Sequence, residues 1–178
     1  MKIILSAHFD LNKPVKYIKI DSQKMTGLID NFAGVFTAYQ ASRNTGVDLY
    51  LTNFEEINLG GAIALAKDLK DEKLLVIVVD TCTDVGDKDA YLGNVYNFDV
   101  SPLKKKFSKY INFKDEFVDP TEDETAIYGW DYHFPTFYFG IPISGNYHDV
   151  DNKISLEMID KSARILTDVI NFLQEFKD

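Results

Sequence analysis

Histidine and carboxylate residues recur in this sequence where short apolar runs give way to polar residues. His8 and Asp10 follow the first such run, and the doublet Glu55-Glu56 follows a later one. Imidazole nitrogens and carboxylate oxygens are the donors that zinc-type cations accept, whereas Mg²⁺ prefers oxygen ligands alone. The residues that could hold and use such cations are His8, Asp10, Asp30, Glu55, Glu56, Asp80 and His148.

Two imidazoles and three carboxylates are enough to hold two divalent cations about 3.5–4 Å apart. Two cations at that separation repel each other, so we expect one carboxylate to bridge them. A hydrolytic centre also needs a general base within reach of a water. The doublet Glu55-Glu56 offers one carboxylate for ligation and a neighbour for proton transfer.

Each residue also has a structural explanation when taken alone. His8 fits a hydrogen-bonded residue at a strand end, and Asp30-Asn31 fits a helix N-cap. Glu55-Glu56 fits a solvated turn, and Asp80 fits a loop cap. What favours the functional interpretation is that all of them fall at the same end of successive elements.

The elements that must bring these residues together follow from periodicity. Strands alternating with helices predict an α/β fold, a three-layer αβα sandwich with a mixed, largely parallel central sheet. Ligand sites in such sheets form beyond the carboxyl ends of the strands. We expect strands at 2–7, 17–20, 48–54, 73–79, 91–98, 111–118 and 136–141, helices at 31–43, 59–69, 102–110, 122–128 and 155–176, and a loop at 142–151.

Two of these elements carry strong patterns. The run 73–79 is unbroken and rich in β-branched residues, which is typical of a strand buried on both faces. In the helix 31–43, the spacing of Phe32, Val35, Phe36 and Tyr39 predicts that these four form the buried face.

Composition limits the kind of protein this is. The chain has 178 residues with 46% hydrophobic and 26% charged, which predicts one globular domain over 1–178. The net charge of −9 argues against nucleic acid or an anionic membrane as a partner. Cys82 is the only cysteine, and no apolar run approaches the ~18 residues of a membrane span. With no signal-peptide pattern at the start, we expect a cytoplasmic location.

The ordered set resembles the bimetallic zinc exopeptidases, which include leucine-type and deblocking aminopeptidases, related carboxypeptidases and glutaminyl cyclases. The resemblance is carried by His-x-Asp, Asp-Asn-x-x-Gly, Glu-Glu, a single Asp and a late His. In this chain these are His8 and Asp10, Asp30 with Asn31 and Gly34, Glu55-Glu56, Asp80 and His148, supported by Gly60-Gly61 and by Gly140-Ile141-Pro142.

The resemblance implies the fold of the zinc aminopeptidases, which is phosphorylase/hydrolase-like, and a role for each residue. It implies that Asp30 bridges two zinc ions, with His8 and Asp80 on one and Glu56 and His148 on the other. Glu55 would be the general base. Two further roles follow: Asp10 would orient His8 by accepting its second N–H, and Asn31 would follow a strained peptide bond.

This chain also departs from the family pattern. Only a short segment separates Asp10 from Asp30, so no lid or dimerisation insertion is expected, and the site should be open or closed by a second copy of the chain. Where relatives often have an Asp-His pair, this chain has Asp123-Glu124-Thr125. We interpret His133 as part of a structural aromatic loop and Cys82 as a small loop residue.

The sequence therefore predicts a zinc-dependent exopeptidase, an aminopeptidase that acts on peptides or aminoacyl compounds. Two alternatives stay open. One is a non-catalytic, metal-stabilised binding or assembly module of the same fold. The other is an amide hydrolase or glutaminyl cyclase that uses the same site.

Overall fold

A six-stranded mixed sheet forms the centre of the molecule. The computed structural model describes residues 1–83, 85–114 and 123–175. The strand order is β4-β1-β5-β8-β6-β7, and all neighbouring pairs are parallel except β6 with β8. The strands are β1 (Lys2–His8), β4 (Asp48–Thr52), β5 (Leu74–Cys82), β6 (Ala90–Tyr96), β7 (Ile111–Phe113) and β8 (Thr136–Pro142).

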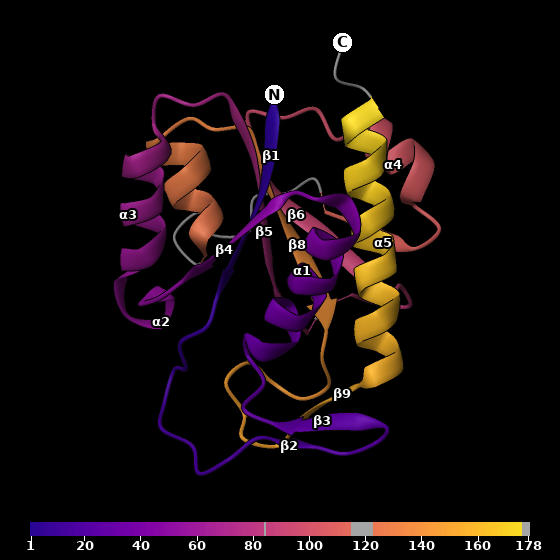
Figure 1. Ribbon diagram of the computed structural model, residues 1–178. Helices are drawn as coiled ribbons and strands as arrows, with labels where there is room; N and C mark the ends of the chain where they lie inside the picture. The colour runs from indigo at the N-terminus through magenta and orange to yellow at the C-terminus, as the bar shows by residue number, and fades with distance from the viewer. Residues whose placement is uncertain (84, 115–122, 176–178) are drawn as a thin grey trace.

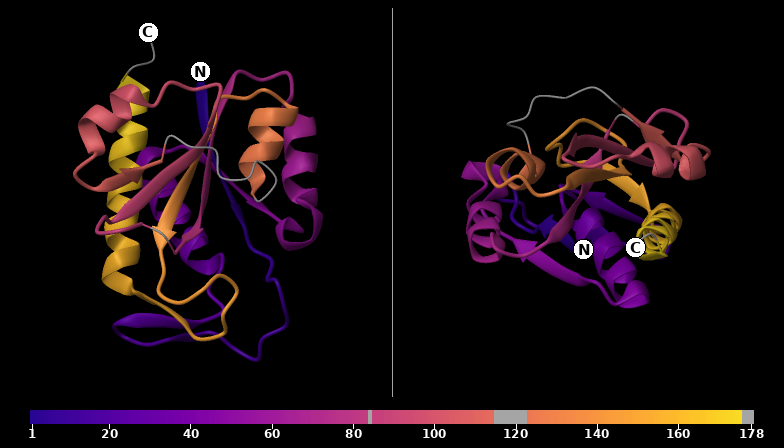
Figure 2. Two further views of the ribbon diagram at one scale, coloured as in Figure 1. Left: turned by 180° about the vertical axis from the view of Figure 1, so that it is seen from behind. Right: turned by 90° about the horizontal axis from the view of Figure 1, so that it is seen from above.

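Helices cover both faces of this sheet, which confirms the predicted three-layer α/β fold (Figures 1 and 2). The helices α1 (Phe32–Thr45) and α5 (Leu156–Glu175) pack together on one face. The helix α3 (Gly60–Leu69) and the π-helix η1 (Ala126–Asp131) cover the other. Two shorter helices, α2 (Glu55–Asn58) and α4 (Ser101–Phe107), complete the set among the described residues.

The two helical layers create two cores because side chains alternate along each strand. In β1, Ile3 and Leu5 belong to the core under α1 and α5, whereas Ile4 belongs to the core under α3 and η1. The same alternation holds in β5, where Ile77 and Val78 belong to opposite cores. The run 73–79 is therefore a central strand, as its composition predicted.

The buried face of α1 differs from the predicted one. Phe32 and Val35 are partly buried against the core, as predicted, but Phe36 and Tyr39 are 43% and 50% exposed. The helix instead buries its small residues, which let its backbone approach the sheet closely. These are Ala33, Gly34, Thr37, Ala38 and Ala41.

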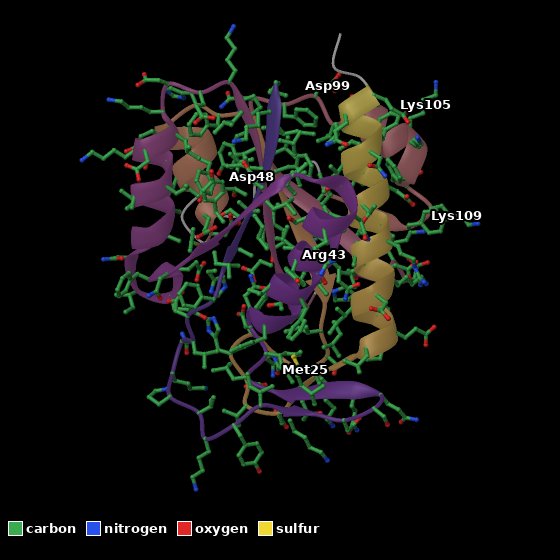
Figure 3. The ribbon with its side chains drawn as sticks, viewed as in Figure 1. Met25, Arg43, Asp48, Asp99, Lys105 and Lys109 are labelled. Atoms are coloured by element: carbon green, nitrogen blue, oxygen red, sulfur yellow. The ribbon has the colours of Figure 1, made fainter. Side chains whose placement is uncertain are left out.

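A second, smaller antiparallel sheet lies beyond the ends of the main strands, below them in Figure 1. It joins β2 (Lys19–Ile20), β3 (Lys24–Gly27) and β9 (Asn152–Ser155). Of these strands only the first falls within the predicted set, and it is shorter than the expected 17–20. Met25 is fully buried and points from β3 toward the main core, which anchors this sheet (Figure 3).

Three other boundaries also differ. The strand β5 continues through Asp80 to Cys82, so Asp80 lies within the strand and Cys82 is its buried last residue, not a loop residue. The predicted strand 111–118 ends at Phe113, and its residues 115–118 lie outside the described part. The predicted helix 122–128 is helical from residue 124, continues as the π-helix η1 and ends later, at Asp131, while residue 122 is likewise not described. Within the described ranges, no helix is long and apolar enough to cross a membrane.

The chain that enters α1 is held by a buried asparagine. Asn31 was predicted to cap this helix, but its side chain makes no capping hydrogen bond. Its amide donates instead to the carbonyl of Val79 at 2.8 Å, which ties the start of α1 to β5. A Cβ at Gly34 would lie 1.9 Å from Oδ1 of Asn31, so only glycine leaves room for this side chain.

We therefore expect Gly34→Ala to destabilise the protein by about 3 kcal/mol or more, because it overpacks the site and displaces a buried hydrogen bond. Chemical denaturation measures the loss. A matched control is Gly46→Ala at the other end of α1, where φ is 74° and a Cβ meets nothing within 4 Å. That change should cost only the left-handed penalty of about 1–2 kcal/mol, and equal losses would contradict the explanation.

Candidate metal centre

A cavity of about 770 Å³ lies where β1 and β5 end. Every sequence-predicted donor except Asp10 lines it, although these residues come from distant parts of the chain. They are His8, Asp30, Glu55, Glu56, Asp80 and His148. The structure therefore brings together the residues that the sequence singled out, at the carboxyl edge of the sheet.

The donors form three groups of three residues, and two of these groups share Asp30. In one group, atoms of His8, Asp30 and Asp80 lie within 4.8 Å of one another, and in the other, atoms of Asp30, Glu56 and His148 do. The two oxygens of Asp30 face different imidazoles: Oδ1 is 3.4 Å from Nε2 of His8, and Oδ2 is 3.6 Å from Nε2 of His148. This geometry matches a carboxylate that bridges two cations.

The other donor atoms close each group. Nε2 of His8 lies 3.4 Å from Oδ1 of Asp80, and Nε2 of His148 lies 3.2 Å from Oε2 of Glu56. Glu55 belongs to neither of these two groups, but it forms the third group with His8 and Glu56, whose donor atoms also lie within 4.8 Å of one another. Its Oε2 is 3.9 Å from Nε2 of His8, so it stands beside the first group with its carboxylate facing the cavity.

A short helix with strained ends positions the Glu55-Glu56 doublet. The helix α2 starts after Phe54 and ends before Leu59, and these two residues have φ of 64° and 57°. The left-handed region is unfavourable for such large side chains, so the surrounding structure must hold them there. Glu55 and Glu56 therefore belong to a helical turn, and the alternative explanation that they form a solvated turn does not hold.

Asp10 helps to keep α2 in place. Its Oδ1 and Oδ2 accept the backbone N–H groups of Glu55 and Glu56 at 3.2 and 3.3 Å. A carboxylate at the first turn is also favoured by the helix dipole. Nδ1 of His8 lies 3.6 Å from Asp10, which is longer than a hydrogen bond. Sequence reasoning missed the contact between Asp10 and α2, because nothing in the spacing links the two segments.

Backbone details fix the other donors. The Asp30-Asn31 peptide bond is cis. Oδ1 of Asp80 accepts the N–H of Thr81 at 2.6 Å, which restricts the orientation of this carboxylate within β5. His148 lies in the loop after β8 with φ of 61°, and its side chain is 40% exposed. His148 is more accessible than His8, so the group of Asp30, Glu56 and His148 lies nearer the opening of the cavity.

The clustered charges shift one another's pKa. Burial alone would lower the pKa of His8, but the charge of Asp80 and contacts with Asp30 and Asp80 outweigh it and raise the pKa to about 12. Burial, followed by the charge of Asp80, raises the pKa of Glu55 to about 9. Burial and the charge of Asp30 raise the pKa of Asp80 to about 8. Without cations, the cluster therefore holds protons that isolated side chains would release.

Several buried donor atoms in this cluster lack a hydrogen-bond partner in the described protein. They are Nδ1 of His8, Oδ1 of Asp30 and Oε1 of Glu56. Buried polar atoms are normally paired, so such a concentration calls for an explanation. Nitrogen and carboxylate donors in groups of three suit zinc-type cations. The residues present therefore fit a pair of such ions.

Other lining residues were not predicted. Asn12 donates to Oε2 of Glu56 at 3.3 Å, and Tyr147 precedes His148 in the same wall. Cys82 and Asp123 also line the cavity, although the sequence predicted no role in the site for either residue. His133 does not line it; this residue is exposed in the turn after η1, as expected of a structural loop.

Comparison with known proteins gives a fold but no family. No family model matches the sequence, and a search of curated proteins finds no significant match. Among solved structures, PhTET1-12s, described as a dodecamer, matches with a TM-score of 0.63 at 16% identity, over 87% of this chain and 53% of that one.

Two archaeal aminopeptidases match in the same way. One is a TET aminopeptidase from a marine sediment archaeon of the Thaumarchaeota, with a TM-score of 0.60, 19% identity and coverage of 86% and 51%. The other is from Desulfurococcus kamchatkensis, with a TM-score of 0.59, 16% identity and coverage of 90% and 54%. This chain spans about half the length of these neighbours. At such identities the likeness establishes the fold alone.

The pKa shifts predict how stability depends on pH without metal. Glu55 and Asp80 have raised pKa values, and so does His8, so above about pH 5 the folded chain binds more protons than the unfolded one. Stability then falls with pH, by about 1.4 kcal/mol per pH unit for each extra proton. The lowered pKa of Asp30 acts only at more acidic pH.

We therefore expect the melting temperature of chelator-treated protein to fall steadily between about pH 5 and about pH 9. Glu55→Gln should show a shallower fall, because one titrating carboxyl is gone. Added zinc should flatten the profile of the unmodified chain. A metal-free profile that is level or rises with pH would contradict the assigned shifts.

Proposed function

We propose that this chain is a catalytic domain of a metal-dependent exopeptidase, an aminopeptidase that hydrolyses N-terminal peptide bonds with two zinc ions. The observation that carries the proposal is the placement of Asp30, whose two oxygens face the imidazoles of two separate donor groups. A general base stands beside them in the same cavity. The aminopeptidases of similar fold lend further support.

In this proposal His8 and Asp80 hold one ion, Glu56 and His148 hold the other, and Asp30 bridges them. When bound, two zinc ions lower the pKa of a water and polarise the scissile carbonyl. The donor set suits zinc better than Mg²⁺, which prefers oxygen ligands.

Glu55 acts as the general base. Its carboxylate lies outside the two groups that share Asp30, lines the cavity and lies close to His8, and in this proposal it accepts a proton from the attacking water. It then passes that proton to the leaving amine. Asp10 serves the reaction indirectly, because its hydrogen bonds to the first turn of α2 hold Glu55 at the cavity wall.

Replacing the base tests this assignment directly. We expect Glu55→Gln to lower kcat on aminoacyl-anilide substrates by about 10²–10⁴-fold, because general-base catalysis contributes that much. Its zinc content, measured by elemental analysis, should equal that of the unmodified chain, because Glu55 is not a ligand.

The control is Glu157→Gln, which changes an exposed glutamate on α5 and should leave kcat unchanged. Full activity of Glu55→Gln would refute the role of the base. An unmodified, zinc-loaded chain that releases no amino acid from a broad panel, including N-terminal glutamine peptides, would count against the exopeptidase itself.

A second candidate is a non-catalytic module of the same fold in which metal only stabilises the chain. Its support is that the chain spans about half the length of its structural neighbours. Unfolding on chelation, together with no hydrolysis of any substrate in the panel, would favour this module. The free Glu55 argues for the enzyme, since a purely structural site needs no base.

We also propose that the chain forms homo-oligomers. PhTET1-12s is described as a dodecamer, and the TET1 peptidase of Pyrococcus horikoshii as able to assemble into a tetrahedron or a large octahedral shell. Both β4 and β7 are edge strands that offer unpaired backbone groups to another chain. Light scattering coupled to size exclusion should give a mass above that of one chain, and a strictly monomeric mass would contradict the proposal.

A further inference from the structure

Glu124 is a buried acid to which the proposed mechanism gives no role. It is 1% exposed, which is less than any other aspartate or glutamate in the described chain. Its position, just before η1, lies outside all three donor groups. No lysine or arginine of the described residues pairs with it. A buried carboxylate without a cation is costly, so its presence requires an explanation.

Hydroxyl groups surround this carboxylate. Ser6 donates to Oε2 at 2.6 Å, and Thr52 donates to Oε1. The hydroxyl of Tyr128 lies 2.9 Å from that of Ser6 and completes the network. Both carboxylate oxygens therefore accept hydrogen bonds, which an amide of the same shape could not do without turning its NH₂ group toward a hydroxyl.

The partners of Glu124 belong to the two strands that lead into the metal centre. Ser6 lies two residues before His8 in β1, and Thr52 is the last residue of β4, three residues before Glu55. These strands are neighbours, and His8 pairs in register with Thr52. A single side chain thus spans the two strand ends that present a metal donor and the base.

The carboxyl group of Glu124 is thereby linked, through one hydroxyl on each strand, to the two segments that present His8 and Glu55.

We propose that Glu124 is a positioning residue of the two-metal centre. Through Ser6 and Thr52 it holds the ends of β1 and β4 in register, and it thereby positions His8 and Glu55 at the cavity. This inference rests on the proposed function, because it assigns Glu124 to the same centre. It adds a residue outside the ligand set whose loss should be felt in metal affinity more than in folding.

The test is a titration of the metal-free full chain with Co²⁺, in which affinity is measured by chelator competition and coordination by the visible absorption spectrum. We expect Glu124→Gln to bind Co²⁺ about 10–100-fold more weakly, as outer partners of metal ligands typically do. Its metal-free melting temperature should stay equal or rise, because a buried charge is removed. A residue with a merely structural role would lower the melting temperature and leave the affinity of the folded protein unchanged.

Ser6→Ala and Thr52→Val provide independent variants that keep the carboxylate. Each should weaken Co²⁺ binding in the same direction, and Ser6→Ala combined with Glu124→Gln should be no weaker than Glu124→Gln alone. Glu157→Gln is the matched control and should bind like the unmodified chain. If Glu124→Gln does not fold, the two hydroxyl variants decide the question.

Equal Co²⁺ affinity and equal spectra for Glu124→Gln and the unmodified chain would overturn the inference and leave the proposed function standing. The same holds if Glu124→Gln is unfolded and both hydroxyl variants bind normally. An unmodified chain that binds Co²⁺ but hydrolyses nothing would refute only the proposed function. An unmodified chain that binds no Co²⁺ would refute both.

Discussion

Repulsion between buried carboxylates is the constraint on which the rest of this structure depends. Asp30, Glu55, Glu56 and Asp80 converge on one cavity, where the imidazole of His8 lies between Asp30 and Asp80. Burial first, and then the charge of a neighbouring carboxylate, raises the pKa values of Glu55 and Asp80, so without cations the cluster holds protons. Two divalent cations would relieve the repulsion without protonation, and they would leave the carboxylates ionised for ligation and catalysis.

Groups that repel one another stay together only if the backbone holds them. The helix α2 is held between the left-handed residues Phe54 and Leu59 and is tied by Asp10 to the segment after β1. The start of α1 is tied to β5 by Asn31, which needs the space left by Gly34. These restraints combine hydrogen bonds to a carboxylate, a neutral hydrogen bond within the core and close packing, and together they fix the backbone on both sides of the cluster.

The sequence was sufficient to predict that these side chains lie together, because each follows or ends an apolar run and parallel strands end at the same edge of a sheet. It was misleading for α1, where hydrophobicity pointed to Phe36 and Tyr39 while close packing selected alanine and glycine. It was silent on the pairing of β3 with β9, because short strands joined across most of the chain leave no local pattern. The contact of Asp10 with α2 was hidden for the same reason.

The net charge of −9 acquires a different meaning once these contacts are known. A uniformly acidic surface would serve solubility and would cost little, because exposed charges are screened by water and salt. Here several of the surplus acids are instead gathered in and beside one cavity, with Glu124 buried just outside it. Charge at that location is screened far less, so it acts on whatever enters the cavity. What distinguishes this acidity is therefore its placement, because carboxylates gathered at the carboxyl edge of the sheet would attract cations there.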